Sequence, residues 1–216
     1  MAKKGRGILL VYTDIDEKYD EEFNAWYDTQ HLPQLLSIPG MLAGARYTAV
    51  KGGPKYLAAY ELESVDVLQT PAFKDRVRPP WDARMSPSII GKNYARVVAE
   101  QIFPDHVVGA ERGMAPVLQI GRMSVGPEVD AEWNAWYNGE YIPAYLKVPG
   151  VISSRRYRVV EGSTRYTTMY EFASVDVPES AAWNEARLHS SPKNIPMRDA
   201  MEMAPGSPGV YRRMGS

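Results

Sequence analysis

The chain has no cysteine among its 216 residues, which excludes disulfides, thiolate catalysis and cysteine metal sites. Excess charge of either sign is also lacking. The 25 basic and 26 acidic residues leave a net charge of -1, so we expect neither nucleic acid nor a membrane surface as a partner. No apolar run approaches the ~20 residues of a membrane span, and residues 8–11 are too short for a secretory signal. A cytoplasmic protein with a small-molecule substrate is the expectation.

Several catalytic signatures are missing as well. The sequence has no glycine-rich phosphate loop, no serine nucleophile elbow and no helical pair of histidines. It has only three histidines, and His106 and His189 lie far along the chain from His31. We therefore expect no metal site and no cofactor.

An internal repeat is the strongest positive signal. Residues 23–67 align with residues 133–177 at a constant offset of 110 without a gap, and 19 of these 45 positions are identical. The period is far longer than that of a solenoid, so each copy should be a domain-like unit. The expected organisation is a first unit over 1–103, a linker over 104–113 and a second unit over 114–216.

Each copy shows the same succession of elements. An apolar strand precedes an aromatic-rich helix that we expect to break before Pro33 or Pro143. A glycine-containing hairpin follows, and Ser64 and Ser174 are suited to cap a second helix. The strands are expected at residues 8–12, 41–50, 56–62 and 93–103, and at residues 117–123, 151–160, 165–172 and 210–214. The order β-α-β-β-α-β predicts an α+β fold of two tandem ferredoxin-like units that pair sheet to sheet.

A family resemblance is carried by residues 23–33, by Ile38-Pro39-Gly40 and by the strand with Arg46 and Tyr47. This pattern resembles the dimeric α+β barrel superfamily, and within it the EthD-like and polyketide-cyclase-like branches. The resemblance implies pockets between each curved sheet and its helices. It also implies cofactor-independent cyclases, isomerases or monooxygenases, or haem enzymes, and a possible homodimer. His31 matches the histidine that these enzymes often place in the pocket, whereas the second copy has Tyr141.

The end of the first helix carries the main catalytic candidate. Neutral imidazole exchanges protons near pH 7, so His31 could act as a general acid or base, with Asp28 orienting it. Trp26, Tyr27 and Gln30 lie on the aromatic face of this helix and could line the substrate pocket. A helix-end histidine that only binds a carbonyl is the structural alternative.

Further candidates lie on the strands and in the second copy. Arg46 could hold a substrate anion together with Tyr47, and retention of the same arginine in both copies also suits a structural role. The remaining substrate-binding candidates are Tyr60, Trp81 as an aromatic lid, Tyr137, Glu140, Tyr141 and Arg156.

Three functions therefore compete. The leading hypothesis is a cofactor-independent lyase, isomerase, cyclase or dehydratase that transfers protons on an aromatic or polyketide-like substrate. A cofactor-free monooxygenase is the alternative within the enzymes. A non-catalytic ligand-binding or stress-associated barrel is the second function, and a haem protein of the same superfamily is the third.

Overall fold

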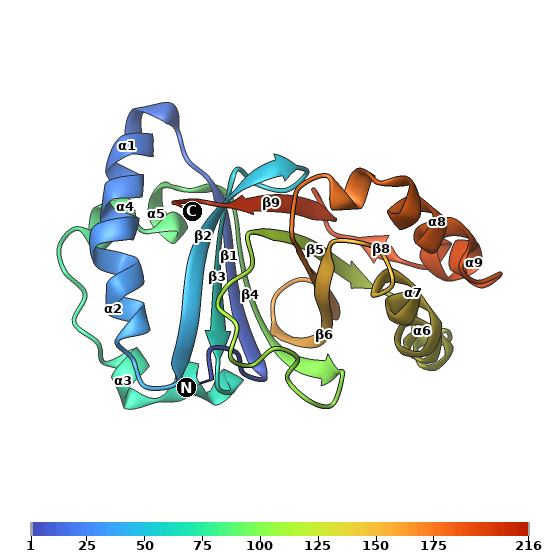
Figure 1. Ribbon diagram of the computed structural model, residues 1–216. Coiled ribbons are helices and arrows are strands. Elements are labelled where there is room, and N and C mark those ends of the chain that lie inside the picture. Colours follow the sequence, from blue (N-terminus) through green and yellow to red (C-terminus); the bar gives the residue numbers. More distant parts are fainter. Residues whose placement is uncertain (1, 216) are drawn as a thin grey trace.

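Eight antiparallel strands close into one barrel in the computed structural model, which describes residues 2–215 (Figure 1). The order around the barrel is β7-β6-β4-β1-β3-β2-β9-β5, and β5 pairs with β7 to close it. Strand β8 (Glu202–Met203) adds two residues beside β5. The barrel strands are β1 (Gly7–Asp14), β2 (Met41–Lys51), β3 (Tyr56–Leu62), β4 (Lys92–Phe103), β5 (Val117–Ser124), β6 (Val151–Glu161), β7 (Tyr166–Phe172) and β9 (Gly209–Arg213).

Each half of the chain contributes four strands in the same spatial order. The first half supplies β4-β1-β3-β2, and the second supplies the equivalent strands β9-β5-β7-β6. The expected pairing of sheet to sheet takes the form of hydrogen-bonded edges, because β2 pairs with β9 and β4 pairs with β6. Both sheets lose their free edges in this way, which is how a barrel removes unpaired strand edges.

The first helix of each half covers the outer face of its sheet (Figure 1). In the first half α1 (Glu17–Trp26), a π turn η1 (Tyr27–His31) and α2 (Leu32–Leu36) follow one another without a gap. The second half repeats this with α6 (Asp130–Trp136), η3 (Tyr137–Tyr141) and α7 (Ile142–Tyr145). The expected break at the prolines is therefore wrong: the helix continues, and the i to i+5 hydrogen bond from Leu32 to Tyr27 widens one turn just before Pro33.

The second helical region differs between the halves. In the first half Ser64 caps only a 3-10 turn η2 (Val65–Gln69), followed by the short helices α3 (Pro71–Lys74), α4 (Asp82–Met85) and α5 (Pro87–Ile90). In the second half η4 (Val177–Glu179) precedes α8 (Ala181–His189) and α9 (Asn194–Asp199). Ser180, rather than the expected Ser174, caps the helix α8. The prolines between residues 71 and 87 explain why the first half forms short pieces, since proline removes a helix donor.

Three apolar cores result. One fills the barrel, and one lies between the sheet and the helices of each half. Every residue of β3 and β7 is buried, because one face of these strands meets helices and the other meets the barrel interior. Within residues 2–215 no helix has the length and apolar character needed to cross a bilayer.

Two buried ion pairs inside the barrel join the halves. Lys4 binds Glu171, and Arg155 binds Glu61 through both carboxylate oxygens, one of them at 3.1 Å from Nη1. Glu61 and Glu171 occupy equivalent positions of β3 and β7, and each finds its cation on the opposite half. Both pairs are buried from water, so each charge depends on the groups that bind it, namely its partner and, for Glu171, also the Ser153 hydroxyl.

Candidate functional site

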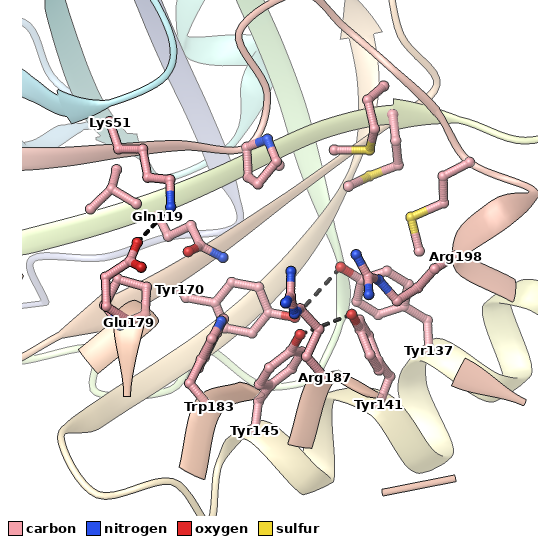
Figure 2. Close-up of a pocket in the computed structure, with 17 residues that line it drawn as sticks. Lys51, Gln119, Tyr137, Tyr141, Tyr145, Tyr170, Glu179, Trp183, Arg187 and Arg198 are labelled. Carbon is pink, nitrogen blue, oxygen red and sulfur yellow. Dashed lines mark hydrogen bonds and ion pairs between the residues drawn. The ribbon is translucent and has the colours of Figure 1, made fainter. Parts of the chain in front are cut away.

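A cavity of about 340 Å³ lies between the sheet and the helices of the second half (Figure 2). Its floor is strand β5 and its sides are η3, α7 and α8. The volume falls in the range of sites that enclose small organic molecules. The residues that matter for its chemistry are Gln119, Tyr137, Tyr141, Tyr145, Tyr170, Glu179, Trp183, Arg187 and Arg198, and several methionines complete the lining.

Aromatic rings form flat walls in this cavity. Tyr145 stacks on Trp183 with ring centroids 3.9 Å apart, and Tyr141 lies against Trp136 at 4.3 Å. Tyr170 meets Trp183 edge-on. Because these rings are already held by one another, they lose little further entropy when a planar ligand packs against them, so the walls favour aromatic molecules.

The tyrosine hydroxyls of the cavity lining are paired with one another. Tyr145 donates a hydrogen bond of 2.8 Å to Tyr141, and the hydroxyls of Tyr137 and Tyr170 lie 3.5 Å apart (Figure 2). Burial raises the pKa of Tyr141 to about 12 and raises the pKa values of Tyr145 and Tyr170 further. The phenols therefore stay protonated at neutral pH and serve as hydrogen-bond donors, not as bases.

Two guanidinium groups make the cavity electropositive. Neither Arg187 of α8 nor Arg198 of α9 forms an ion pair with a carboxylate within residues 2–215, and both are near enough to oppose the rise in the pKa of Tyr141. Arg187 donates to Asn184 at 2.9 Å, while its buried Nε has no partner in this part of the chain. Glu179, the acidic residue of the lining, is bound to Lys51 at 2.6 Å. The cavity is thus equipped for an anion.

The π turns decide which side chains reach the interior. One extra residue in the turn places positions i and i+5 above each other, so His31 stacks on Trp26 at 4.4 Å and Tyr141 lies over Trp136. A regular helix would instead have turned Gln30 and Glu140 inward. Gln30 donates to Asp82 at 2.7 Å, and Glu140 is exposed and accepts from Ser191. Neither lines the cavity that its helix neighbour Tyr27 or Tyr137 lines, and Glu140 instead borders a separate cavity between α7 and α8.

His31 lies at a smaller cavity of about 130 Å³ in the first half. Tyr27 and Tyr60 line it too, and the Tyr60 hydroxyl donates to the Tyr27 hydroxyl at 2.9 Å. The Nδ1 atom of His31 is buried without a hydrogen-bond partner among the described residues. Burial lowers the pKa of His31 to about 4, with Asp82 opposing this shift. The imidazole is therefore neutral at pH 7 and a weak base.

The expected orientation of His31 by Asp28 is not found. Asp28 is more than half exposed and pairs with Arg46 at 2.9 Å on the outer side of the helix. Arg46 also binds Asn24 and lies 4.7 Å over the Tyr27 ring. Its counterpart Arg156 binds Asn138 and Asn134 at 2.6 and 2.8 Å in the same manner. Both arginines fasten the helix to the sheet. This contact agrees with the structural role that their presence in both copies also suited.

Tyr47 and Trp81 do not reach the small cavity either. Neighbouring residues of a strand face opposite sides, so Arg46 faces the helices while Tyr47 enters the barrel and donates to the carbonyl of Ala115 at 2.9 Å. Trp81 donates its Nε1 to Glu22 at 2.8 Å and packs beside the core instead of closing a pocket. Trp26 stacks behind His31 and donates to Asp82 at 2.9 Å.

Sequence reasoning missed most residues of the larger cavity, among them Tyr145, Trp183, Arg187 and Arg198. Trp183 and Arg187 are four residues apart on α8, so the amphipathic spacing of that helix could have placed them on one face. Arg198 lies beyond Pro192 and Pro196, where the sequence offers no periodic signal. Tyr141 and Tyr137 were expected at a pocket, and both line this one.

The haem implied for some members of the superfamily finds no suitable ligand here. A proximal ligand is usually imidazole or thiolate, whereas the cavity of the second half is lined by phenols and thioethers. The raised pKa of Tyr141 opposes the phenolate that iron would need. Within residues 2–215 no cluster of His, Asp and Glu is arranged to hold a metal ion. The lining residues of this cavity therefore do not fit a haem.

Comparison with solved structures shows which known proteins share this fold. No known family model and no curated protein sequence matches the chain. An anthrone oxidase-like protein superposes with a TM-score of 0.63 at 12% identity, covering 99% of this chain and 94% of that one. A proposed monooxygenase from Fusobacterium nucleatum gives 0.61 at 10% identity over 97% and 93% of the two chains. Chlorite dismutase from Candidatus Nitrospira defluvii gives 0.63 at 12% over 99% and 92%. These structures belong to the dimeric α+β barrel superfamily, so the resemblance is confirmed for the fold.

Proposed function

We propose that this chain is a cofactor-independent oxygenase that binds an aromatic, enolisable or phenolic substrate in the cavity of the second half. The observation that carries the proposal is the combination of flat aromatic walls with two guanidinium groups that have no carboxylate partner within residues 2–215. Similarity to an anthrone oxidase-like protein and to a proposed monooxygenase supports the same chemistry. We also propose that the chain arose by tandem duplication of one ferredoxin-like unit and belongs to the EthD-like branch.

The cavity is suited to stabilise the substrate as an anion. Arg187 and Arg198 would lower the pKa of a bound phenol or enol by placing two positive charges beside its oxygen. The protonated hydroxyls of Tyr141 and Tyr170 would donate hydrogen bonds to the same oxygen. An anion formed in this way carries electron density on its ring carbon, where dioxygen reacts.

The chemistry then balances without a cofactor. The carbanion form of an activated CH₂ group adds to O₂, which gives a peroxide anion on that carbon. One proton converts it to the hydroperoxide, and loss of water leaves a carbonyl group. The substrate carbon is oxidised, one oxygen atom remains in the product and the other leaves as water. The protein supplies binding, orientation and stabilisation of the oxyanion.

This reaction fits the residues better than a proton-transfer lyase or isomerase in the same cavity. Such an enzyme needs a side chain that accepts and returns a proton near pH 7. The phenols of the cavity have raised pKa values, and Glu179 is tied to Lys51 at the exposed rim. An acidic substrate that reacts as an anion can lose its proton to solvent.

General acid–base catalysis at His31 is a second candidate, which its buried and unpartnered Nδ1 favours. The small volume beside it restricts this candidate to substrates of a few heavy atoms. A pKa of about 4 also makes His31 a poor base at neutral pH. The expected cofactor-free lyase or isomerase would therefore act on much smaller molecules than a polyketide.

The test is oxygen consumption with anthrones and polyhydroxylated aromatic ketones as substrates. Arg187→Gln and Arg198→Gln should each reduce kcat/KM about 10- to 100-fold, the usual loss for one hydrogen bond to a charged group. Arg158→Gln is the matched control, because Arg158 is exposed on β6 outside the cavity. Turnover that proceeds without oxygen, or a double variant with unchanged kcat/KM, would contradict the proposal.

A further inference from the structure

The small cavity of the first half contains two buried nitrogen atoms that lack partners. Nδ1 of His31 and Nε of Arg76 both have no hydrogen-bond acceptor or donor within residues 2–215, and both side chains line the same space. The charge of Arg76 acts on His31 and on Tyr60, which places the guanidinium beside both groups. A buried polar group without a partner costs about 1–3 kcal/mol, so two of them at one cavity indicate a ligand that satisfies both.

The charges around this cavity leave a positive excess. Arg76 donates to the Phe73 carbonyl and forms no ion pair in the described part of the chain, while Arg96 is paired with Glu161. Asp82 acts on both His31 and Arg76, but it does not line the cavity, and one of its oxygens already accepts from Trp26 and Gln30. The free charge is therefore that of Arg76, and it selects an anion.

The shape restricts the anion to a short molecule. The volume of about 130 Å³ corresponds to roughly four molecules of liquid water. Beside the polar groups the lining is apolar, with Leu9, Leu35 and Phe73 facing the same space as the hydroxyl of Ser86. A ligand that fits needs an anionic head and a short hydrocarbon tail.

We propose that the cavity of the first half is a binding site for a small aliphatic monocarboxylate, from acetate to butyrate in size. The carboxylate would accept from the guanidinium of Arg76 and from an N–H at Nδ1 of His31, with the tail against Leu9 and Leu35. The paired hydroxyls of Tyr27 and Tyr60 close the polar side. This site shares no lining residue with the cavity of the second half, so the inference does not rest on the proposed oxygenase function.

Nuclear magnetic resonance of the histidine side chains tests the site in the full-length protein. The chain has three histidines, and His31→Gln assigns the resonance of His31. Titration with propionate should shift that resonance in a saturable way, and His106 and His189 should not move. Propionamide has the same size without the charge and should bind at least about tenfold more weakly. Hexanoate should bind no more tightly than butyrate, because the cavity has no room to bury the rest of its tail.

Variants separate this site from the larger cavity. Arg76→Gln should weaken propionate binding by about tenfold or more, and Arg76→Lys should be intermediate because it keeps the charge but loses the planar fork. Arg84→Gln, an exposed arginine of α4, and Arg187→Gln in the second half should leave propionate binding unchanged. If Arg76→Gln does not fold, Arg76→Lys and the propionamide comparison still decide.

The proposal would be overturned by any of three results. No saturable shift of His31 at about 50 mM propionate would mean that no such site exists. Equal binding of propionate and propionamide would show that the cavity does not select an anion. Unaltered binding in Arg76→Lys would show that Arg76 does not hold the carboxylate through its planar fork.

Discussion

The two halves of the barrel share a framework but enclose different spaces. In both halves a π turn stacks a ring on a buried tryptophan, and an arginine fastens the helix to the sheet. In the first half the short helices α3 to α5 fold over the sheet and leave about 130 Å³ around His31. In the second half the helices α8 and α9 leave about 340 Å³ around Tyr141. The framework is thus conserved between the halves, whereas the second helical region sets the size and charge of each cavity.

The tryptophans test whether the shared framework is equally important in both halves. Trp26 and Trp136 are 0% and 1% exposed, and each donates Nε1 to a polar partner on the second helical region, Asp82 or Asn194. Replacing either by alanine should lower the free energy of unfolding by about 4 kcal/mol through the lost burial and the cavity left behind. Chemical denaturation of Trp26→Ala and Trp136→Ala measures this. If only one of the two variants lost stability, the shared framework would not be equally important in both halves.

The ion pairs inside the barrel test whether the halves depend on each other. Glu61→Gln leaves the buried Arg155 without its countercharge, and Glu171→Gln does the same to Lys4. Each change should cost about 3 kcal/mol, because removing one partner strands a charge in a poorly solvating interior. The transition should stay single, since both pairs cross between the halves. Two separate unfolding transitions would show that the halves are independent.

His31 should make the stability of the protein depend on pH, whereas the second half has Tyr141 at the equivalent position. The pKa of His31 falls from 6.5 to about 4 on folding, because burial disfavours the imidazolium. The unfolded chain therefore binds more protons between these values, so stability decreases as the pH falls from about 6.5 towards 4. The loss should reach about 2 kcal/mol near pH 4.5.

His31→Gln should remove this contribution, and His189→Gln, an exposed histidine, should retain it. The measurement is the difference in unfolding free energy between pH 7 and pH 4.5 for the three proteins. Equal differences in all three would show that His31 does not titrate as its burial requires.

The smallest effect is expected at the rim between the halves. Lys51 and Glu179 form an ion pair of 2.6 Å with both side chains about two thirds exposed. Glu179→Gln should change the unfolding free energy by less than about 0.5 kcal/mol, because water screens the pair. The effect of Glu179→Gln on substrate affinity should report on the second half alone, because this ion pair lines only the larger cavity.

The fold followed from the sequence far more fully than the site did. The repeat and the strand patterns predicted the barrel strands to within a few residues, because alternating burial leaves a direct trace in the sequence. The aromatic face of the first helix was also predicted correctly for Trp26 and Tyr27. The π turn was not, and a helix read with a period of 3.6 therefore turned Gln30 and Glu140 inward.

The long-range partners could not be read from the chain. Asp28 was expected beside His31 because the two are three residues apart, yet it binds Arg46 from the next strand. Asp82, which acts on His31, is more than fifty positions away in a proline-rich segment without periodicity. Such contacts arise only when the second helical region folds over the first, and no local pattern encodes that.

The place of the last strand has a consequence for how the protein is made. Strand β9 fills the gap between β2 and β5, so the barrel closes only with residues 209–213. During synthesis the first four strands leave the ribosome with two unpaired edges, β2 and β4. The edge of β4 gains its partner when β6 is complete, but β2 must wait for the C-terminal segment. Until then the newborn chain carries an open strand edge, the type of surface at which growing polypeptides associate with one another.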